Sequence, residues 1–350
     1  MKTLAAILVE TGKPLALEEL EIPALKPGQV LTQIACSGVC HTQVLECRGL
    51  RGEDKFVPHC LGHEAGGTVL EIGAGVTKVK PGDAVILSWI KGSGANVPGT
   101  TYTWRGRNVN AGAVTTFSQH AVVSENRLTI KPAALSMTQA ALLGCAVPTG
   151  AGAVFNAAQP RAGQSLVVFG IGGVGGCAVG AAVAAGCNPV IAVDVVPEKL
   201  ELARALGATH VVHGRQEDAV QAIAKICPGG ADFAIEATGR PEVMRQALQC
   251  VRQQGGTAVV IGNAPFGQML TLDPFQFNLG KRLLGTWGGD SVPDRDYPRF
   301  GELIASGKLP LHGLTTRAYA LTEINQAIDD LEAARVARPI VEMMAGGRAV

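Results

Sequence analysis

A glycine-rich turn between a buried strand and a helix constrains the fold of this chain more than any other feature. The apolar run SLVVFG at 165–170 has the length of a buried strand, and the small-residue run at 175–186 is typical of a helix. Further strand and helix patterns alternate along the chain, and the alternation fades after about residue 287. This alternation predicts a parallel sheet with helices on both faces.

The turn itself, Gly170-Ile171-Gly172-Gly173-Val174-Gly175, matches the dinucleotide fingerprint G-x-G-x-x-G. The first glycine permits the tight turn, the second lets a pyrophosphate approach the backbone, and the third lets the helix meet the strand. Free N–H groups at the helix start then face the phosphates. Asp194 ends the next strand, where a carboxylate accepts from the ribose hydroxyls and repels a 2′-phosphate. The pattern predicts NAD rather than NADP; the alternative is a glycine-rich turn in a fold without a nucleotide.

The whole chain fits a globular protein of two domains. Its 350 residues exceed one ordinary core, and 47% hydrophobic with 17% charged residues exclude a disordered chain. Residues 1–145 contain short strand-like runs broken by glycine and proline, for example at 30–35, 67–73 and 83–87, so this part is expected to be β-rich. After about residue 287 the pattern indicates one helix and a final strand.

Charge and hydropathy argue against nucleic acid and membranes as partners. The net charge is +1 without long charged runs, and no apolar run reaches about 18 residues. The start MKTLAAILVE fits a strand better than a signal peptide, because Glu10 follows the short apolar stretch at once. The nine cysteines have no framework spacing, which predicts reduced thiols in a cytoplasmic protein.

Three separated segments offer metal ligands: Cys40-His41-Thr42, His63-Glu64 and Cys145. Taken singly, a cysteine is often a small buried hydrophobe and a histidine a hydrogen-bonded core residue. The first segment is also consistent with a redox thiol or a catalytic relay. The sequence contains no C-x-x-C or H-E-x-x-H motif that would by itself indicate a metal site. Two cysteines and one histidine are nonetheless a sensible zinc set, and three protein ligands leave one position open, as in catalytic sites.

The motifs come in the order of the zinc-dependent alcohol dehydrogenases, a family of the medium-chain dehydrogenase/reductase superfamily, and the resemblance covers nearly the whole chain. It is carried by Cys40-His41-Thr42, GHEAGG at 62–67, Gly82-Asp83, Gly144-Cys145, Thr149-Gly150, the glycine fingerprint and Asp194. It implies an α/β protein. A β-rich, GroES-like catalytic domain is expected at 1–146 and 288–350, and a Rossmann domain, a doubly wound parallel sheet that binds NAD, at 147–287.

The resemblance implies roles for the residues around the metal. Cys40, His63 and Cys145 look like the ligands of one catalytic zinc ion. Glu64 resembles the adjacent acid that can approach the metal in place of water. Thr42 resembles the hydroxyl that takes the substrate's proton, and His41 stands where the family has a basic residue against the cofactor pyrophosphate.

Other positions resemble cofactor and substrate contacts. Trp89 looks like the bulky aromatic of the substrate pocket, with ordinary core packing as the alternative. Thr149 and Val174 resemble residues that pack against the nicotinamide. Lys199 resembles the cation beside the adenosine ribose, and Arg338 resembles a pyrophosphate-binding arginine. The phosphates themselves are expected at Gly170, Gly172, Gly173 and Gly175.

The chain departs from the family at three places. Many members hold a second, structural zinc with four cysteines, but residues 88–117 contain no cysteine, so one zinc per chain is expected. Gln43 stands where the family usually has an aspartate behind the ligands; its carbonyl can accept a hydrogen bond from His63 but adds no charge. Leu45 replaces the histidine that passes a proton to solvent in many members.

The sequence therefore predicts a zinc-dependent, NAD-linked dehydrogenase that reversibly oxidises an alcohol to an aldehyde or ketone, with zinc as Lewis acid. A polyol or amino-alcohol dehydrogenase of the same superfamily is the nearest alternative. A non-catalytic nucleotide-binding relative is the rival from another class; it would be expected to lose a metal ligand, and this chain keeps all three. The expected partners are a small alcohol, aldehyde or ketone and further copies of the chain in a dimer or tetramer.

Overall fold

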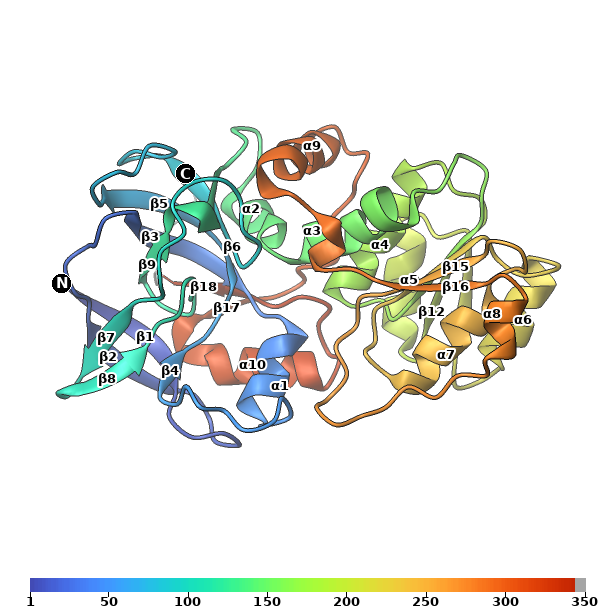
Figure 1. Ribbon diagram of the computed structural model, residues 1–350, viewed down its shortest axis with the longest axis horizontal. Coiled ribbons are helices and arrows are strands. Elements are labelled where there is room, and N and C mark those ends of the chain that lie inside the picture. Colours follow the sequence, from blue (N-terminus) through green and yellow to red (C-terminus); the bar gives the residue numbers. More distant parts are fainter. Residues whose placement is uncertain (344–350) are drawn as a thin grey trace. The chain divides into compact units, whose positions relative to one another are not determined.

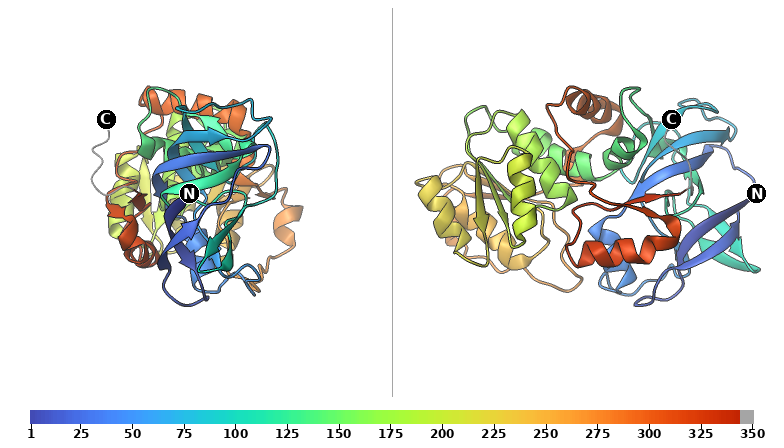
Figure 2. Two further views of the ribbon diagram at one scale, coloured as in Figure 1. Left: turned by 90° about the vertical axis from the view of Figure 1, so that its left-hand side faces the viewer. Right: turned by 180° about the vertical axis from the view of Figure 1, so that it is seen from behind.

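The chain forms two units of different architecture in a computed structural model that describes residues 1–343. Unit 1 comprises Met1–Cys145, Val292–Gly301 and the chain from Thr315, and unit 2 comprises Ala146–Ser291 and Glu302–Leu314. Figures 1 and 2 show the elements of both units. The predicted α/β class, with a β-rich part and a parallel sheet, is confirmed.

Unit 1 contains two β-sheets. One is a closed barrel of order β1-β2-β7-β8-β4, and the other has the order β10-β6-β5-β3-β18-β17, with β9 also paired to β3. The strands are β1 (Lys2–Leu8), β2 (Ala16–Glu21), β3 (Gln29–Gly38), β4 (His59–Cys60), β5 (Glu64–Ile72), β6 (Ala84–Ser88), β7 (Thr101–Trp104), β8 (Arg107–Asn110), β9 (His120–Ser124), β10 (Leu128–Ile130), β17 (Ala318–Ala320) and β18 (Ile340–Glu342).

Strands β1 and β3 contribute to two apolar cores at once. Successive side chains of a strand point to opposite faces of its sheet. Accordingly Ile7 and Leu31 join the barrel core, whereas Leu8 and Val30 join the larger core of the second sheet. Burial on both faces explains why these strands have long apolar runs, and why the sequence predicts them.

Helices are short in unit 1. They are α1 (His41–Cys47), α2 (Met137–Leu143) and α10 (Ile324–Glu332), with the 3-10 turns η1 (Glu125–Arg127) and η4 (Leu321–Glu323). A capping box begins α2, in which Ser136 Oγ accepts from the Gln139 N–H and Gln139 Oε1 accepts from the Ser136 N–H. The sequence analysis did not predict α9 (Pro293–Ala305), because prolines at 293 and 298 mask its pattern.

The segment without cysteines, residues 88–117, contains the hairpin β7–β8 of the barrel. Tyr102, at 0% exposure, joins the barrel core, and its hydroxyl oxygen accepts a hydrogen bond from the Val122 N–H at 2.8 Å. The Trp104 ring lies beneath the guanidinium groups of Arg105 and Arg107, at 5.3 and 5.6 Å. Apolar burial and cation–π contacts therefore hold this hairpin.

Unit 2 contains a six-stranded sheet of order β13-β12-β11-β14-β15-β16, and every adjacent pair is parallel. This is the doubly wound order of a dinucleotide-binding fold. The strands are β11 (Leu166–Phe169), β12 (Val190–Asp194), β13 (His210–His213), β14 (Phe233–Glu236), β15 (Thr257–Val260) and β16 (Arg282–Gly285). The helices are α3 (Ala146–Gly152), α4 (Gly173–Ala184), α5 (Pro197–Ala205), α6 (Ala219–Ile226), α7 (Pro241–Cys250) and α8 (Phe275–Asn278), with the π-helix η2 (Ala153–Ala158) and the 3-10 turn η3 (Gly288–Asp290).

The helix that follows the fingerprint packs unusually close to its strand. A Cβ on Gly175 would lie 1.8 Å from the carbonyl oxygen of Gly170, so only glycine fits there. The residues of α4 are small or β-branched and mostly buried, which lets the helix lie tightly against the sheet. In residues 1–343, no single helix is long and apolar enough to span a membrane; Met137–Leu143 with Ala146–Ala158 meets that test only as a bent pair.

Candidate functional site

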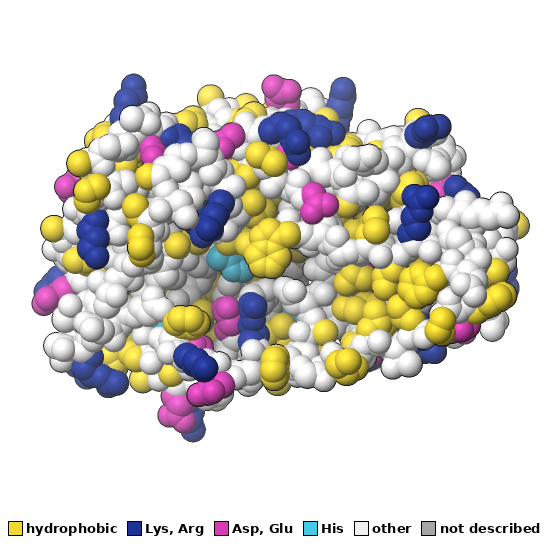
Figure 3. All heavy atoms as spheres, viewed as in Figure 1, with side chains coloured by type: hydrophobic (Ala, Val, Ile, Leu, Met, Phe, Trp, Pro, Cys, Tyr) yellow, Lys and Arg dark blue, Asp and Glu magenta, His cyan; other side chains and the backbone are white. Residues whose placement is uncertain are grey.

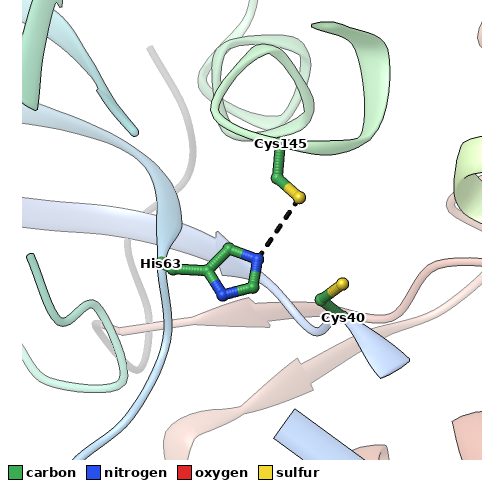
Figure 4. A group of neighbouring side chains, drawn as sticks. All are labelled: Cys40, His63 and Cys145. Atoms are coloured by element: carbon green, nitrogen blue, oxygen red, sulfur yellow. Dashed lines mark hydrogen bonds between the residues drawn. The ribbon is translucent and has the colours of Figure 1, made fainter. Parts of the chain in front are cut away.

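Cys40, His63 and Cys145 form a cluster within unit 1, and Figure 4 shows their side chains pointing toward one another. Cys40 follows β3 and caps α1, His63 precedes β5, and Cys145 follows α2. Their donor atoms all lie within 4.8 Å of one another. His63 Nε2 lies 3.3 Å from Cys145 Sγ. Two sulfurs and an imidazole nitrogen suit zinc, so the residues present fit the predicted metal.

A close approach of three segments brings the cluster together. A Cβ on Gly144 would lie 2.4 Å from the Leu87 carbonyl oxygen and 2.8 Å from Glu64 Cβ. Glycine before Cys145 therefore lets the end of α2 contact β6 and β5 directly.

The two thiols of the cluster differ in proton affinity. A hydrogen bond from Cys145 holds the pKa of the Cys40 thiol well below its usual value, with Arg338 and His63 acting in the same direction. The same bond raises the pKa of Cys145. The pair thus readily loses one proton, and metal binding requires the loss of the second.

Gln43 lies behind the cluster, but its amide is not oriented as expected. Its Oε1 accepts a hydrogen bond from the Cys40 N–H at 2.9 Å, and its Nε2, not its carbonyl, faces His63 Nδ1. Leu45 is buried, with 5% exposure.

Glu64 and Arg338 form a buried ion pair. Glu64 Oε1 lies 2.8 Å from Arg338 Nε and 2.7 Å from Nη2, with side-chain exposures of 0% and 3%. The group of mutually close donors found within residues 1–343 does not include Glu64. A metal role for Glu64 and a pyrophosphate role for Arg338 stay predictions.

Thr42 and Trp89 lie beside the cluster. Thr42 Oγ1 is 3.7 Å from Cys40 Sγ, and the Trp89 ring stands edge-on to His63 with the ring centroids 6.4 Å apart. His41 is the exposed first residue of α1. The roles of Thr42, Trp89 and His41 stay predictions.

The predicted cofactor residues belong to unit 2, except His41 and Arg338, which belong to unit 1. Asp194 Oδ2 accepts from the Ile171 N–H of the fingerprint at 2.6 Å, and Oδ1 accepts from the N–H groups of Val195 and Val196. Asp194 therefore holds the glycine turn as well as ending β12. Lys199 is half-buried on α5.

Two further features of unit 2 are consistent with a bound dinucleotide. Gly170 has a φ of +86°, and a Cβ there would lie 2.6 Å from Thr238 Cγ2, so the turn leaves no room for a side chain. Thr149 Oγ1, on α3, is buried and has no hydrogen-bond partner in the described part of the chain. Val174 lies in the first turn of α4. An orphaned hydroxyl and a bare glycine turn fit a dinucleotide.

Comparison with known proteins agrees with this geometry. Residues 26–133 match the alcohol dehydrogenase GroES-like domain, and residues 173–306 match the zinc-binding dehydrogenase family. An S-(hydroxymethyl)glutathione dehydrogenase of Synechocystis sp. is 35% identical over 97% of this chain and 100% of that protein. The crystal structure of benzyl alcohol dehydrogenase from Acinetobacter calcoaceticus has a TM-score of 0.90 and 31% identity over 98% of this chain and 100% of that one. The chain belongs to the zinc-dependent alcohol dehydrogenases. The predictions of family, of an enzyme acting on CH–OH donors and of NAD-linked alcohol oxidation are confirmed.

This alcohol dehydrogenase also relies on residues that the sequence did not single out. Buried Ser88 donates through Oγ to the Gly144 carbonyl at 2.7 Å and lies 2.6 Å from the hydroxyl of Tyr297. The pair fixes the backbone directly before Cys145. A serine after an apolar strand is a weak signal, and Tyr297 lies on the helix that the sequence analysis missed.

Removing one partner of the buried ion pair should destabilise the alcohol dehydrogenase strongly. Arg338→Met leaves the Glu64 carboxylate buried without a counter-charge, which we expect to cost about 3–5 kcal/mol in the free energy of unfolding. The double variant Glu64→Gln/Arg338→Met should recover most of that loss, because no buried charge remains. Urea unfolding measures both.

The exposed pair Lys2–Glu19, with side-chain exposures of 61% and 60%, provides the control. Lys2→Met should change stability by less than about 1 kcal/mol. A similar loss for Arg338→Met and Lys2→Met would contradict the importance of the buried pair.

Proposed function

We propose that Cys40, His63 and Cys145 hold one catalytic zinc ion. The observation that carries this proposal is the convergence of two thiols and one imidazole within 4.8 Å. When bound, zinc supplies a Lewis acid for the oxygen of an alcohol or carbonyl substrate. A single ion per chain is supported by the absence of cysteine from residues 88–117.

The chain's own residues would move the proton and orient the substrate. Thr42 Oγ1 takes the proton of the substrate hydroxyl, which is supported by its place beside Cys40. Leu45 cannot carry the proton onward, so transfer from Thr42 would go to water or to His41. Trp89 would form one wall of the substrate pocket, since its ring edge faces His63. Glu64, which directly follows His63 in the sequence, would be the acid that can approach the metal in place of water.

The Rossmann unit, predicted at 147–287, would bind NAD. The glycines 170, 172, 173 and 175 would face the pyrophosphate, and Asp194 would accept from the ribose hydroxyls. Thr149 and Val174 would contact the nicotinamide, supported by the unpartnered Thr149 hydroxyl. Lys199 would lie beside the adenosine ribose, and His41 and Arg338 would contribute positive charge for the pyrophosphate.

We propose as substrate a primary alcohol with an apolar or aromatic group. The Trp89 ring beside the cluster supports this choice, as does the structural likeness to a benzyl alcohol dehydrogenase. The relatives named S-(hydroxymethyl)glutathione dehydrogenase make a thiol-conjugated alcohol the second candidate. Nine free cysteines support a cytoplasmic location.

We also propose that the enzyme is a homo-oligomer joined through unit 2. Strand β16 ends the parallel sheet, and an open strand edge is a template for pairing with a second copy. Figure 3 shows hydrophobic side chains gathered on a face of the molecule. The large exposed hydrophobic residues of unit 2 between 266 and 287 are Phe266, Met269, Phe275, Phe277, Leu284 and Trp287. Burial of this surface would favour association.

The metal prediction is about one zinc per chain by elemental analysis, since only one ligand set is proposed. Cys145→Ser should lose zinc and turnover yet remain folded, by circular dichroism. The control is Cys187→Ser, which changes a buried thiol of unit 2 and should keep both zinc and turnover. A reproducible zinc content near two would overturn the single-zinc proposal.

We expect the enzyme to have a higher kcat/KM with NAD than with NADP, by a ratio that corresponds to roughly 2–4 kcal/mol. The measurement uses a panel of aromatic, thiol-conjugated, polyol and amino-alcohol substrates, so that it also compares the candidate substrates. Asp194→Ser should narrow the gap and weaken both cofactors, because Asp194 also holds the glycine turn. Asp218→Ser, which replaces the carboxylate that caps α6 with a hydroxyl, should leave the ratio unchanged. Equal use of both cofactors by the unaltered enzyme would refute the role of Asp194.

The assembly prediction concerns Leu284 on β16. Leu284→Lys should shift the enzyme toward the monomer in analytical ultracentrifugation, because a charge would enter the proposed contact. Leu70→Lys is the matched control, since Leu70 on β5 is 39% exposed and Leu284 is 41% exposed. A monomeric unaltered enzyme, or equal effects of the two lysines, would contradict the proposed surface.

A further inference from the structure

The Gln43 side chain lies between the first turn of α1 and the His63 imidazole. Its Oε1 accepts from the Cys40 N–H at 2.9 Å, the bond by which a glutamine at the third helical position caps a helix. Its Nε2 lies 2.5 Å from His63 Nδ1. Gln43 is only 2% exposed, so water has little access to either contact.

The tautomer of His63 decides whether its Nε2 can bind a metal. Nε2 is the nitrogen that faces the thiols, at 3.3 Å from Cys145 Sγ. A neutral imidazole that binds through Nε2 carries its proton on Nδ1, and that N–H needs an acceptor. Gln43 instead offers Nδ1 an amide N–H, which favours the proton on Nε2. The hydrogen bonds around His63 therefore favour the tautomer that does not bind metal.

Turning the amide over does not remove this conflict. The Gln43 oxygen would then accept from His63 Nδ1–H, but the amide nitrogen would face the Cys40 N–H, one donor against another. An amide has one acceptor atom for these two donors, whereas a carboxylate has two. With the proton on His63 Nδ1, as metal binding through Nε2 requires, either orientation of Gln43 leaves one buried N–H without an acceptor, and such a group is costly.

We propose that Gln43 is a positioning residue that lowers the metal affinity of the Cys40–His63–Cys145 cluster. Metal binding through His63 is coupled to a turn of the Gln43 amide and to the loss of its cap on α1. This inference rests on the proposed zinc site and concerns how tightly that site holds its ion.

The first test is the zinc dissociation constant, measured by competition with a chromophoric chelator. Gln43→Glu supplies two oxygens at nearly the same length, so zinc should bind roughly 10- to 100-fold more tightly. Gln43→Asp, a shorter carboxylate, is a second variant should the first fail to fold. Gln139→Glu is the matched control, because Gln139 caps α2 in the same way without contacting a proposed ligand, and it should leave zinc affinity unchanged.

The second test separates hydrogen bonding from charge, because a carboxylate also attracts the cation directly. Nitrogen-15 NMR of the zinc-depleted protein reports which ring nitrogen of His63 carries the proton. We expect Nε2 in the unaltered protein and Nδ1 in Gln43→Glu. The His63 signals are assigned by their loss in His63→Asn.

The outcomes distinguish this inference from the proposed metal site. Tighter zinc binding in Gln43→Glu together with the change of tautomer supports it. Zinc binding that is equal or weaker in both carboxylate variants, or a His63 proton on Nδ1 in the unaltered protein, overturns it and leaves the zinc site standing. Absence of zinc binding in the unaltered protein and in every variant would refute the metal site, and the inference with it.

Discussion

The buried ion pair between Glu64 and Arg338 ties together the segments that carry the metal cluster. Glu64 begins β5 directly after His63, and Arg338 precedes β18, which pairs with the end of β3 just before Cys40. The Val39 N–H also donates to the Pro339 carbonyl at 3.0 Å. Strand β18 therefore holds the backbone before Cys40 by strand pairing, and Arg338 connects it to Glu64, which follows His63. Because both charges are buried, the pair holds only while the two segments stay together.

The same pair balances the charge of the cluster. When zinc binds, both cysteines would be thiolates; together with the Glu64 carboxylate they would carry three negative charges, and Arg338 would offset one of them. A divalent zinc ion with a neutral His63 would leave the buried group formally neutral, whereas a carboxylate at position 43 would leave one negative charge. Gln43 therefore favours a neutral site at the expense of a hydrogen bond to its histidine ligand. In a buried site, both an unbalanced charge and an unpaired hydrogen-bond donor cost free energy. Gln43 avoids the unbalanced charge but not the unpaired donor.

Features that depend on local sequence were predictable, and features that depend on distant pairing were not. The strands of unit 1 and the alternation of unit 2 follow from side-chain periodicity, and the ligands follow from motifs around Cys40, His63 and Cys145. Glu64 and Arg338 are 274 positions apart in the sequence, and no local sequence pattern indicates that they pair. The Gln43 amide escaped prediction because its orientation depends on competition between a helix cap and an imidazole.

The hairpin β7–β8 has stabilising contacts of its own. The missing cysteines predict that this lobe holds no zinc, but the sequence does not show that its residues complete a barrel around Tyr102. Tyr102 accepts a hydrogen bond from the buried Val122 N–H, and its ring packs in the apolar core of the barrel. Zinc removal from this enzyme should consequently act on the Cys40–His63–Cys145 cluster alone. That separation is what allows a change in zinc affinity at Gln43 to be measured without unfolding of a second site.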